Sequence, residues 1–334
     1  MSITVLRPGL LTSIQDLGRY GYQKYGVIVS GGMDSYALRL ANLLVGNEEG
    51  EALLEMTLMG PWLLVEKDIL IAITGGDLSP TINGESIPMW RPVYIKGGSI
   101  LQFGACMSGC RSYLAVAGGY EIPEVMGSKS TYLRAGIGGF QGRALVQGDS
   151  IELRAPQEIS FRLVESLKKR LLSHSFISTS WHIKKPLMTR NSKQSTVRVT
   201  TGSQFEYFTP ESKKQLFQCP FRVTTQSDRM GYRLSGPVLQ LEEPLEMVSE
   251  AVALGTIQVP PDGNPILLLA DRQTVGGYPK IAQAATVDVS IVAQIKPGGL
   301  ILFQEISLAE AEQLYVARET EIENLGIAIQ LKMS

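Results

Sequence analysis

Histidine and cysteine are scarce in this 334-residue sequence, which has two histidines and three cysteines. His174 and His182 stand eight residues apart, away from Cys106, Cys110 and Cys219, and the cysteines form no C-x-x-C pair. These residues therefore argue against a zinc site, and we expect no metal. They argue equally against a Ser-His-Asp or Cys-His nucleophile, so acid–base chemistry would fall to Asp, Glu, Lys or Tyr. The odd, unpaired cysteines fit a reducing cytoplasm.

A large net charge and a long apolar run are also missing. The formal net charge is −1, which gives no electrostatic reason to bind nucleic acid or an anionic membrane. The longest apolar stretches, such as DILIAITGG and NPILLLA, fall short of the roughly 20 residues that cross a bilayer. The N-terminus has no basic segment followed by an apolar one, so we expect no secretory signal and a cytoplasmic location.

A nucleotide-binding phosphate loop is missing as well. The stretch GGYEIPEVMGSKST, residues 118–131, resembles one superficially. Seven residues separate Gly119 from Gly127 where the motif has four, and Ser128 interrupts the Gly-Lys pair. We therefore predict a turn here, and contact of Lys129 with an anion remains the alternative.

Glycine and proline are abundant, with 34 and 17 residues. They divide the chain into short, β-branched stretches that read as strands. Helical spacing of apolar residues occurs over 33–47, 209–217 and 307–325. The last of these opens with Ser307 and Glu310, the spacing of a capping box. The sequence thus predicts a mainly β fold with few helices.

The chain is long enough for two domains, each with its own core. Basic and hydroxyl residues dominate near the middle, where strand punctuation is poor. We predict an N-terminal β-rich unit over 1–155, a connecting, part-helical segment over 156–195, and a C-terminal β-rich unit with a C-terminal helix over 196–334.

Two short phrases recur about 200 residues apart. QDLGRYGY (15–22) is echoed by QSDRMGYR (226–233), and KGGSILQF (96–103) by KPGGLILF (296–303). The repeated spacing predicts two related β-rich units, in which the echoes occupy comparable places.

Candidate binding residues gather in glycine-rich turns. Arg and Gln are planar donors for carboxylate, phosphate or amide groups, and neighbouring glycines let a ligand approach the backbone closely. For the Asp–Arg pairs of QDLGR and SDRMG, a structural turn clamp is the alternative. The candidates are Gln15, Asp16, Arg19 and Asp34 in the first half and Arg229, Gln258, Asp262, Asp271, Arg272, Gln273, Gly276, Gly277 and Tyr278 in the second.

The stretch DRQTVGGYP, residues 271–279, has the strongest pattern. It places three polar residues, two glycines and a proline directly after the apolar run PILLLA, which is more than a turn needs. Loops carried on rigid strands are where binding residues concentrate. We expect Arg272 or Gln273 to contact substrate, and Gly276 and Gly277 to need positive φ.

Motifs from residue 7 to about 303 resemble the biotin-dependent carboxyltransferase subunit family. They include PGLLTSIQDLGRYGY, LEMTLMGP, YLAVAGG, GSKSTY, SDRMGYRLSGP, GTIQVPPDGNPILLLADRQTVGGYP and AQIKPG. Members of that family are known as the C subunit of 5-oxoprolinase, formerly allophanate hydrolase subunit 2, and as KipA-type antagonists of a kinase inhibitor. GGMD stands where the family pattern has Gly-Ala-Met-Asp, which leaves Asp34 in place.

The resemblance implies two β-barrel-like units of cyclophilin-like topology. It also implies one component of the ATP-dependent 5-oxoprolinase that opens 5-oxo-L-proline to L-glutamate, working with the A-type and the B-type (KipI-type) components. ATP, expected to carry Mg²⁺, would then be shared with a partner, and no biotin would be attached, because the biotinyl-lysine Met-Lys context is missing. Asp16, Asp271, Arg272 and Gln273 are the expected catalytic residues, and the other candidates would bind substrate.

Two alternatives remain open at this stage. One is a carboxyltransferase module that acts on urea or a related amide, since the same modules occur in urea carboxylase. The other is a regulatory partner of a kinase-inhibitor protein that catalyses nothing.

Overall fold

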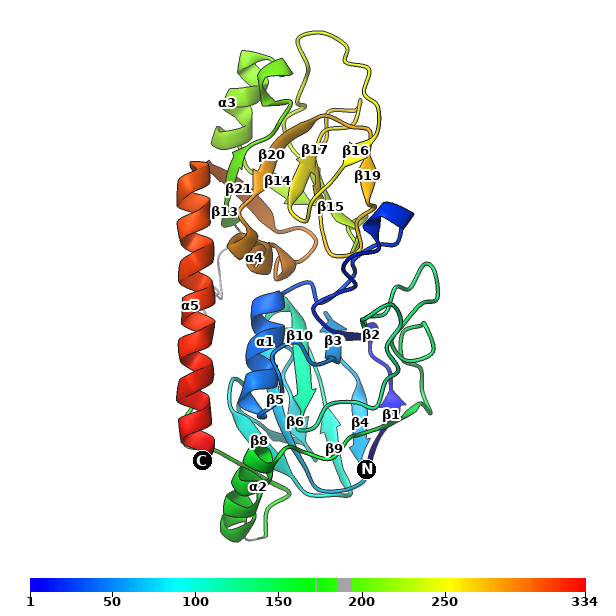
Figure 1. The fold of residues 1–334 in the computed structure, drawn as a ribbon, viewed down its shortest axis with the longest axis vertical. Coiled ribbons are helices and arrows are strands. Elements are labelled where there is room, and N and C mark those ends of the chain that lie inside the picture. The colour runs from blue at the N-terminus through cyan, green and yellow to red at the C-terminus, as the bar shows by residue number, and fades with distance from the viewer. Residues whose placement is uncertain (172, 185–193) are drawn as a thin grey trace. The chain divides into compact units, whose positions relative to one another are not determined.

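The computed structural model describes residues 1–171, 173–184 and 194–334 (Figure 1). Short strands dominate it, and the described residues contain five α-helices. The predicted mainly β fold with two β-barrel-like units and few helices is confirmed, because one unit is a closed barrel and the other is built from two sheets.

The chain forms two compact units, and each draws on separated stretches of sequence. The first unit combines the described parts of 1–19, 30–190 and 322–334, and the second those of 20–29 and 191–321. The division 1–155, 156–195 and 196–334 follows chain order alone and stays a prediction.

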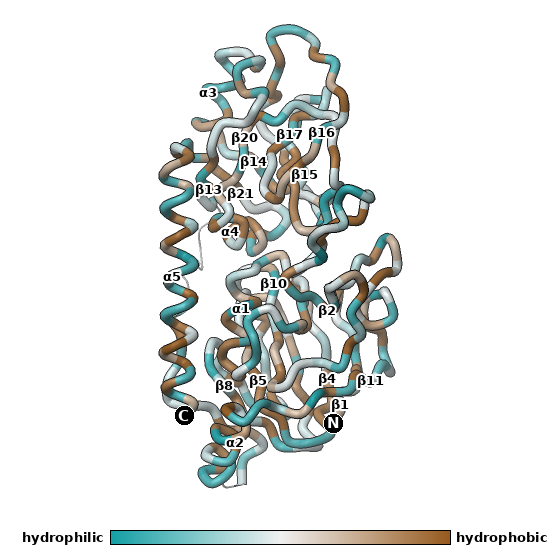
Figure 2. The backbone as a smooth tube through the Cα atoms, in the orientation of Figure 1, coloured by the Kyte–Doolittle hydropathy of each residue, from teal (hydrophilic) through white to brown (hydrophobic). Residues whose placement is uncertain are grey.

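Two six-stranded sheets build the first unit. One has the order β11 (Ser150–Glu152), β1 (Ser2–Arg7), β4 (Trp62–Val65), β9 (Ser99–Gln102), β6 (Thr81–Ile82) and β7 (Glu85–Ser86). The other has the order β12 (Phe176–Ser178), β8 (Pro92–Ile95), β5 (Ile69–Asp77), β10 (Ser108–Val116), β3 (Leu53–Thr57) and β2 (Leu11–Gln15). Their inward-facing aliphatic residues form one shared core, and Figure 2 shows hydrophobic stretches along these strands.

Helix α1 (Ser35–Leu44) packs on β5 and β10 within the predicted range 33–47. Its first turn is closed by Asp34, whose carboxylate accepts a hydrogen bond from the Ala37 N–H at 3.0 Å. Gly46, at φ 74°, follows its last turn. The Thr74 hydroxyl of β5 donates to the Ala37 carbonyl at 2.7 Å and ties the helix to the sheet.

The segment expected to connect the units is partly helical, as predicted. Helix α2 (Glu158–Arg170) buries Leu163 and Leu167 in the core of the first unit. The strand β12 was not predicted; it pairs with β8 because the backbone of 176–178 completes an open sheet edge. Residues 172 and 185–193 of the predicted connection lie outside the described part of the chain.

The second unit is a closed barrel. Its strand order is β13 (Gln194–Thr201), β20 (Lys280–Ala284), β17 (Thr256–Gln258), β18 (Ile266–Leu268), β15 (Gly231–Ser235), β14 (Phe221–Val223) and β21 (Leu300–Glu305). Closure comes from β13 and β21, which run parallel, while the neighbouring pairs around the barrel are antiparallel. The rings of Phe221 and Phe303 fill the interior with centroids 5.7 Å apart.

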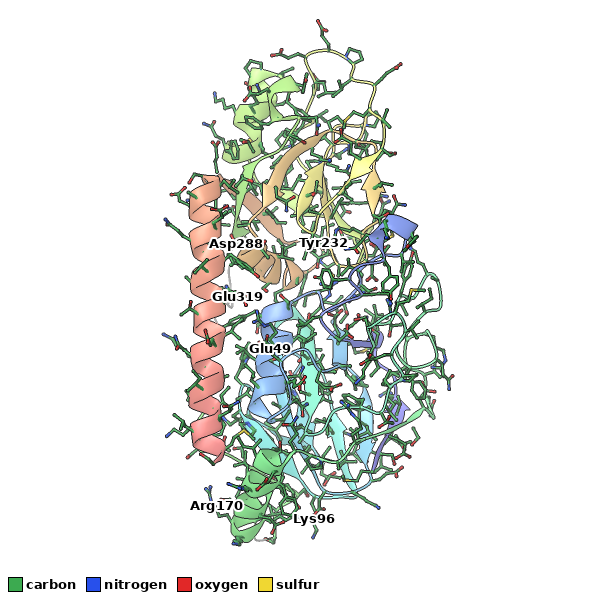
Figure 3. All side chains as sticks on the ribbon, viewed as in Figure 1. Glu49, Lys96, Arg170, Tyr232, Asp288 and Glu319 are labelled. Carbon is green, nitrogen blue, oxygen red and sulfur yellow. The ribbon has the colours of Figure 1, made fainter. Side chains whose placement is uncertain are left out.

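The second unit also contains smaller elements outside the barrel strands. They are a ribbon of β16 (Glu250–Ala251) and β19 (Val275–Gly276), the helices α3 (Pro210–Gln218) and α4 (Val289–Ala293), and the 3₁₀ turns η1 (Gln23–Tyr25), η2 (Phe205–Tyr207) and η3 (Thr286–Asp288). Helix α3 matches the predicted 209–217, with Thr209 capping the Ser212 N–H at 3.2 Å. Asp288, the last residue of η3 and labelled in Figure 3, accepts from the Arg198 Nε at 2.9 Å.

The C-terminal helix α5 (Leu308–Met333) runs eight residues beyond the predicted end at Leu325. The predicted capping box is confirmed, since the Ser307 N–H donates to Glu310 at 2.8 Å and the Glu310 N–H donates to Ser307 Oγ at 3.2 Å. The helix continues because Ile329 and Met333 are buried. Polar and apolar residues alternate along it (Figure 2), and no helix in the described ranges is long and apolar enough to cross a membrane.

The two repeated phrases differ in whether their copies adopt the same structure. QDLGRYGY leaves β2 and continues as a loop, whereas QSDRMGYR is a turn that enters β15, so this echo does not mark comparable places and that prediction is wrong. The KGG and KPGG phrases do form the same structure. Gly98 and Gly298 have φ of 85° and 89°, and each N–H donates at 2.7 Å to a carbonyl, of Val65 and Val223, before a strand begins. In the KGG and KPGG phrases a glycine with positive φ determines the turn, so both copies have the same structure. An Asp–Arg pair places no such restriction on the backbone, so the copies of the other phrase differ.

Candidate functional site

The carboxylate of Asp16 is saturated by hydrogen bonds within the first unit. It accepts from the backbone N–H of Gly18 and Lys129, at 2.8 and 2.6 Å, and from the hydroxyls of Ser128 and Ser130, at 2.8 and 2.5 Å. With four donors in place on a buried side chain, the carboxylate holds the turn after β2 against the 125–131 segment.

Arg19 completes the same clamp. Its side chain is fully buried, and it donates to the carbonyls of Val125 and Ser130 at 2.8 and 3.0 Å. Burial lowers the pKa of the Arg19 guanidinium below its usual value, and the charge of Asp16 partly offsets this. Gln15 joins through a 3.3 Å bond to the Thr131 carbonyl. The structure thus brings Gln15, Asp16 and Arg19 together around protein groups, as expected of a turn clamp.

The GSKST stretch is a turn, as predicted, and its polar groups are engaged. The Lys129 ammonium lies 2.9 Å from a carboxylate oxygen of Glu51, which also pairs with Arg154. The serine hydroxyls on either side point to Asp16. The lysine and the two serines of this stretch are thus engaged by protein carboxylates, which argues against a phosphate-binding role here.

A buried polar cluster that the sequence reasoning missed lies beside Asp34. Glu55 on β3 is 2% exposed and accepts from the Tyr113 hydroxyl at 2.9 Å and from the Met33 N–H at 2.7 Å. Burial, reinforced by Glu55, raises the pKa of Tyr113 well above its usual value. Arg111 Nε lies 3.9 Å from Glu55. An acidic residue within the apolar stretch ALLEM was the signal that could have revealed the cluster.

In the second unit, Arg229 and Asp271 form a buried bidentate ion pair. The Nε–Oδ2 and Nη2–Oδ1 distances are 2.9 and 3.1 Å. The Asp271 N–H also donates to the Arg229 carbonyl at 2.9 Å, which joins the turn before β15 to the end of β18. Nearby on β15, the hydroxyl of Tyr232 donates to the Ile295 carbonyl at 3.2 Å (Figure 3). The structure therefore brings Arg229 and Asp271, both predicted from the sequence, into contact.

Arg272 differs from its neighbour because its guanidinium is poorly satisfied. Nη1 makes one long contact, 3.4 Å to the Leu269 carbonyl, and Nε is buried without a partner in the described part of the chain. Burial lowers the pKa of Arg272, and the nearby Tyr20 partly offsets this. The adjacent Gln273 is exposed. Spare planar donors beside a fixed Asp–Arg pair suit a carboxylate or an amide ligand.

The glycines of the DRQTVGGYP loop do not have the expected geometry. Neither Gly276 nor Gly277 has a positive φ, so that prediction is wrong. Gly276 lies in extended β19, where an added Cβ would stand 2.6 Å from Nε2 of Gln258, so the glycine provides space. That Nε2 donates to the Tyr278 carbonyl at 3.1 Å. Gly277 has room, since the nearest atom, Ser249 Oγ, would be 3.4 Å away.

The remaining candidate, Asp262, is set apart. It lies in the turn between β17 and β18, where its Oδ1 accepts from the Asn264 N–H at 3.1 Å. Asp262 precedes β18 and Asp271 follows it, so they lie at opposite ends of that strand. Within the described residues, no group of three or more His, Cys, Asp or Glu side chains gathers that could hold a metal ion.

The candidates therefore fall into separate groups. Gln15, Asp16 and Arg19 close a turn in the first unit, and Asp34 caps α1 beside Glu55. In the second unit, Arg229, Asp271 and Arg272 share one end of β18, and Gln258 holds the 276–278 backbone. Among the described residues, Gln15 Oε1, Arg19 Nη1 and Arg272 Nε are each buried without a hydrogen-bond partner. Gln15 and Arg19 are fully buried, whereas the side chain of Arg272 is partly open to solvent.

Comparison with known proteins adds a second kind of observation. The model of the carboxyltransferase domain, subdomain A and B, matches residues 25–305. A protein from Haemophilus influenzae that is named as the C subunit of 5-oxoprolinase is 35% identical over 93% of this chain and 92% of its own length. Its namesake from Escherichia coli is 36% identical over 92% and 93%.

Among solved structures, the crystal structure of the K. lactis urea amidolyase superposes with a TM-score of 0.85 at 33% identity. The match covers 97% of this chain but 20% of that protein. The chain thus spans about a fifth of the urea amidolyase and nearly all of the 5-oxoprolinase subunits.

Proposed function

This chain belongs to the carboxyltransferase family, subdomains A and B, and from that premise we propose that it is the C-type component of a 5-oxoprolinase. In this proposal it acts with the A-type and B-type components to convert 5-oxo-L-proline to L-glutamate at the expense of ATP. The observation that carries the proposal is correspondence in length. The chain and the two named relatives match over more than nine-tenths of each other.

The contacts of Arg272 support an anionic amide substrate. 5-Oxoproline is a lactam with a carboxylate, and a guanidinium with unused N–H groups binds a carboxylate through parallel hydrogen bonds. Arg272 keeps such groups, while the neighbouring Arg229 is committed to Asp271. We assign Arg272 to the substrate carboxylate, the exposed Gln273 to the lactam amide, and Asp271 to holding the loop.

The nucleotide belongs mainly to a companion in this proposal. The stretch most similar to a phosphate loop has its lysine paired with Glu51 and its serines bonded to Asp16. The B-type companion would hold ATP and Mg²⁺, and the isolated chain would show negligible turnover. No biotin would be attached to this chain.

Urea is the second candidate substrate, and a specific observation favours it. The urea amidolyase of Saccharomyces cerevisiae is 33% identical over 97% of this chain, although the match covers 18% of that protein. Urea lacks a carboxylate, so it would leave the guanidinium of Arg272 without its strongest type of partner.

The test is 5-oxoproline-dependent ATP hydrolysis by the chain alone, by its two companions, and by all three together. We expect turnover with all three only. Arg272→Gln should raise the KM for 5-oxoproline at least tenfold, because one charge-assisted contact contributes about 1.5–3 kcal/mol. Arg233→Gln is the matched control, since Arg233 is an exposed arginine in the same unit.

Two results would overturn parts of this proposal. Robust turnover by the isolated chain would contradict the shared nucleotide site. Full activity of both Arg272→Gln and Gln273→Ala would make the loop structural. Carboxylation of urea, with a biotin carrier and a biotin carboxylase supplied and no response to 5-oxoproline, would favour the second candidate.

A further inference from the structure

Residues 20–29 form a loop that belongs to a different unit from the chain on either side of it. The chain up to residue 19 and again from residue 30 is part of the first unit, whereas Tyr20–Val29, dark blue in Figure 1, is part of the second. The loop contains η1, the Gly26 N–H donates to the Gln23 carbonyl at 2.9 Å, and Ile28 is buried. A segment from the start of the sequence therefore contributes side chains to the unit that contains β18.

The two ends of this loop are held together at its base. The Gly32 N–H donates to the Asp16 carbonyl at 2.9 Å, and a Cβ added at Gly31 would stand 3.1 Å from the backbone nitrogen of Gly18. The four hydrogen bonds to the Asp16 carboxylate and the buried contacts of Arg19 fix the arm that enters the loop. A loop with closed ends is a common carrier of functional side chains. Its first residue directly follows the fixed arm.

That first residue, Tyr20, lies near Arg272 of the same unit. Burial lowers the pKa of the Arg272 guanidinium and Tyr20 raises it, an electrostatic effect that weakens with distance. Tyr20 is 65% exposed, and the Nε of Arg272 has no hydrogen-bond partner in the part of the chain that the structure describes. An accessible phenol is thus close to a guanidinium with an unused N–H group.

The backbone that carries Arg272 is fixed as well. The Arg272 N–H donates to the Leu269 carbonyl at 3.1 Å, and the Leu269 N–H donates to the Met230 carbonyl at 2.9 Å. The neighbouring Asp271 is held by its bidentate pair with Arg229. The phenol and the guanidinium therefore come from two separately fixed segments, as precise binding of a small ligand requires.

We propose that Tyr20 contacts substrate and determines specificity for an anionic lactam, because its hydroxyl donates a hydrogen bond to the substrate carboxylate that Arg272 binds. A carboxylate accepts several hydrogen bonds on its two oxygens, so a phenol and a guanidinium can share it. Hydrogen bonds to an ionised acceptor are stronger than those between neutral groups. A lactam without a carboxylate would gain nothing from this contact. The inference rests on the proposed function, which supplies the substrate.

The test measures KM and kcat for 5-oxo-L-proline with the assembled three-component enzyme. Tyr20→Phe should raise KM about tenfold and leave kcat within about twofold, because it removes one hydrogen bond to a charged group and keeps the ring. Tyr25→Phe is the matched control, since Tyr25 is on the same loop and is 70% exposed, and it should change neither constant. Both variants should keep the wild-type unfolding temperature.

Two further measurements assign the contact to the carboxylate. 2-Pyrrolidinone, the same lactam without the carboxylate, should inhibit the wild-type and Tyr20→Phe enzymes equally. A tenfold weaker inhibition of Tyr20→Phe would move the contact to the lactam ring and overturn the proposal. The double variant Tyr20→Phe/Arg272→Gln should change KM by a factor that differs at least about threefold from the product of the single effects, because residues that share one partner are coupled. Independent effects would contradict a shared carboxylate.

The remaining outcomes separate this inference from the proposed function. An unchanged KM of Tyr20→Phe, beside an active wild-type enzyme, would overturn the role of Tyr20 and leave the proposed function intact. Equal changes in Tyr20→Phe and Tyr25→Phe would assign the effect to the loop as a whole and overturn the contact. A wild-type assembly that does not respond to 5-oxo-L-proline would overturn the proposed function, and this inference with it.

Discussion

The turn at Asp16 and Arg19 and the loop at Asp271 and Arg272 look alike in sequence but differ in how their polar groups are satisfied. In the first, the carboxylate has four donors and the guanidinium is fully buried against backbone carbonyls. In the second, Asp271 is paired with Arg229, and Arg272 keeps an unmet Nε. Arg19 also has one N–H group without a partner, at Nη1, but its side chain does not reach solvent, whereas Arg272 is partly exposed and is accessible to a ligand. Four substitutions can break or sharpen this contrast.

The largest effect is expected for Asp16→Ala. The substitution removes the acceptor from the N–H groups of Gly18 and Lys129 and from the hydroxyls of Ser128 and Ser130. It also leaves Arg19 buried without its nearby negative charge. Removing one member of such a buried network costs about 3–5 kcal/mol. Urea unfolding followed by fluorescence would measure the loss. A change below about 1 kcal/mol would contradict the clamp.

A smaller loss is expected for Gly276→Ala. The new Cβ would stand 2.6 Å from Nε2 of the buried Gln258, which must shift away from the Tyr278 carbonyl. Overpacking of this kind costs about 1–3 kcal/mol. Gly277→Ala is the control and should change unfolding little, because its nearest neighbour would lie 3.4 Å away. Equal effects of the two substitutions would remove the spatial explanation.

Glu51→Gln should give a smaller effect that depends on pH. Burial alone would raise the pKa of Glu51, but hydrogen bonds from Lys129 and Arg154 outweigh it and lower that pKa below its usual value. A depressed carboxyl pKa contributes stability above the unfolded-state pKa, and this is lost as pH falls through the folded-state pKa. Wild type should exceed the variant by about 1 kcal/mol at pH 7, and the difference should vanish once the pH falls below the folded-state pKa of Glu51. A constant difference would refute this.

The smallest effect on folding is expected for Arg272→Gln. Its guanidinium makes one long contact, so its removal should change the free energy of unfolding by about 0.5 kcal/mol or less. Thermal unfolding beside Arg19→Gln, which removes fully buried contacts, gives the direct comparison. Equal destabilisation by both would show that the two arginines serve the same structural purpose.

Local signals in the sequence located the helices well. Apolar residues at helical spacing predicted α1 within 33–47, and Ser307 with Glu310 predicted the start of α5, because spacing and caps act through neighbouring residues. The barrel closure was not readable in the same way. β13 and β21 pair in parallel across a long separation in sequence, and no short motif encodes that contact.

Prediction of the candidate site from the sequence has the same limit. Sequence patterns found Arg229, Asp271 and Arg272, which follow or precede strands, but they could not show which guanidinium would be left unmet. They missed Glu55, because a single acid in an apolar strand reads as a tolerated exception until its partners Tyr113 and Met33 are placed beside it. They also assigned positive φ to Gly276, where space was the real requirement.

The burial of the C-terminal half of α5 has a consequence for synthesis of the protein. Ile322, Ile329 and Met333 of α5 are buried in the core of the first unit, whose strands lie much earlier in the sequence. Residues 322–333 must therefore be synthesised before this unit can close its core. A nascent chain that stopped before Ile322 would expose that uncovered apolar surface to chaperones and proteases, so a truncation within α5 would destabilise the first unit.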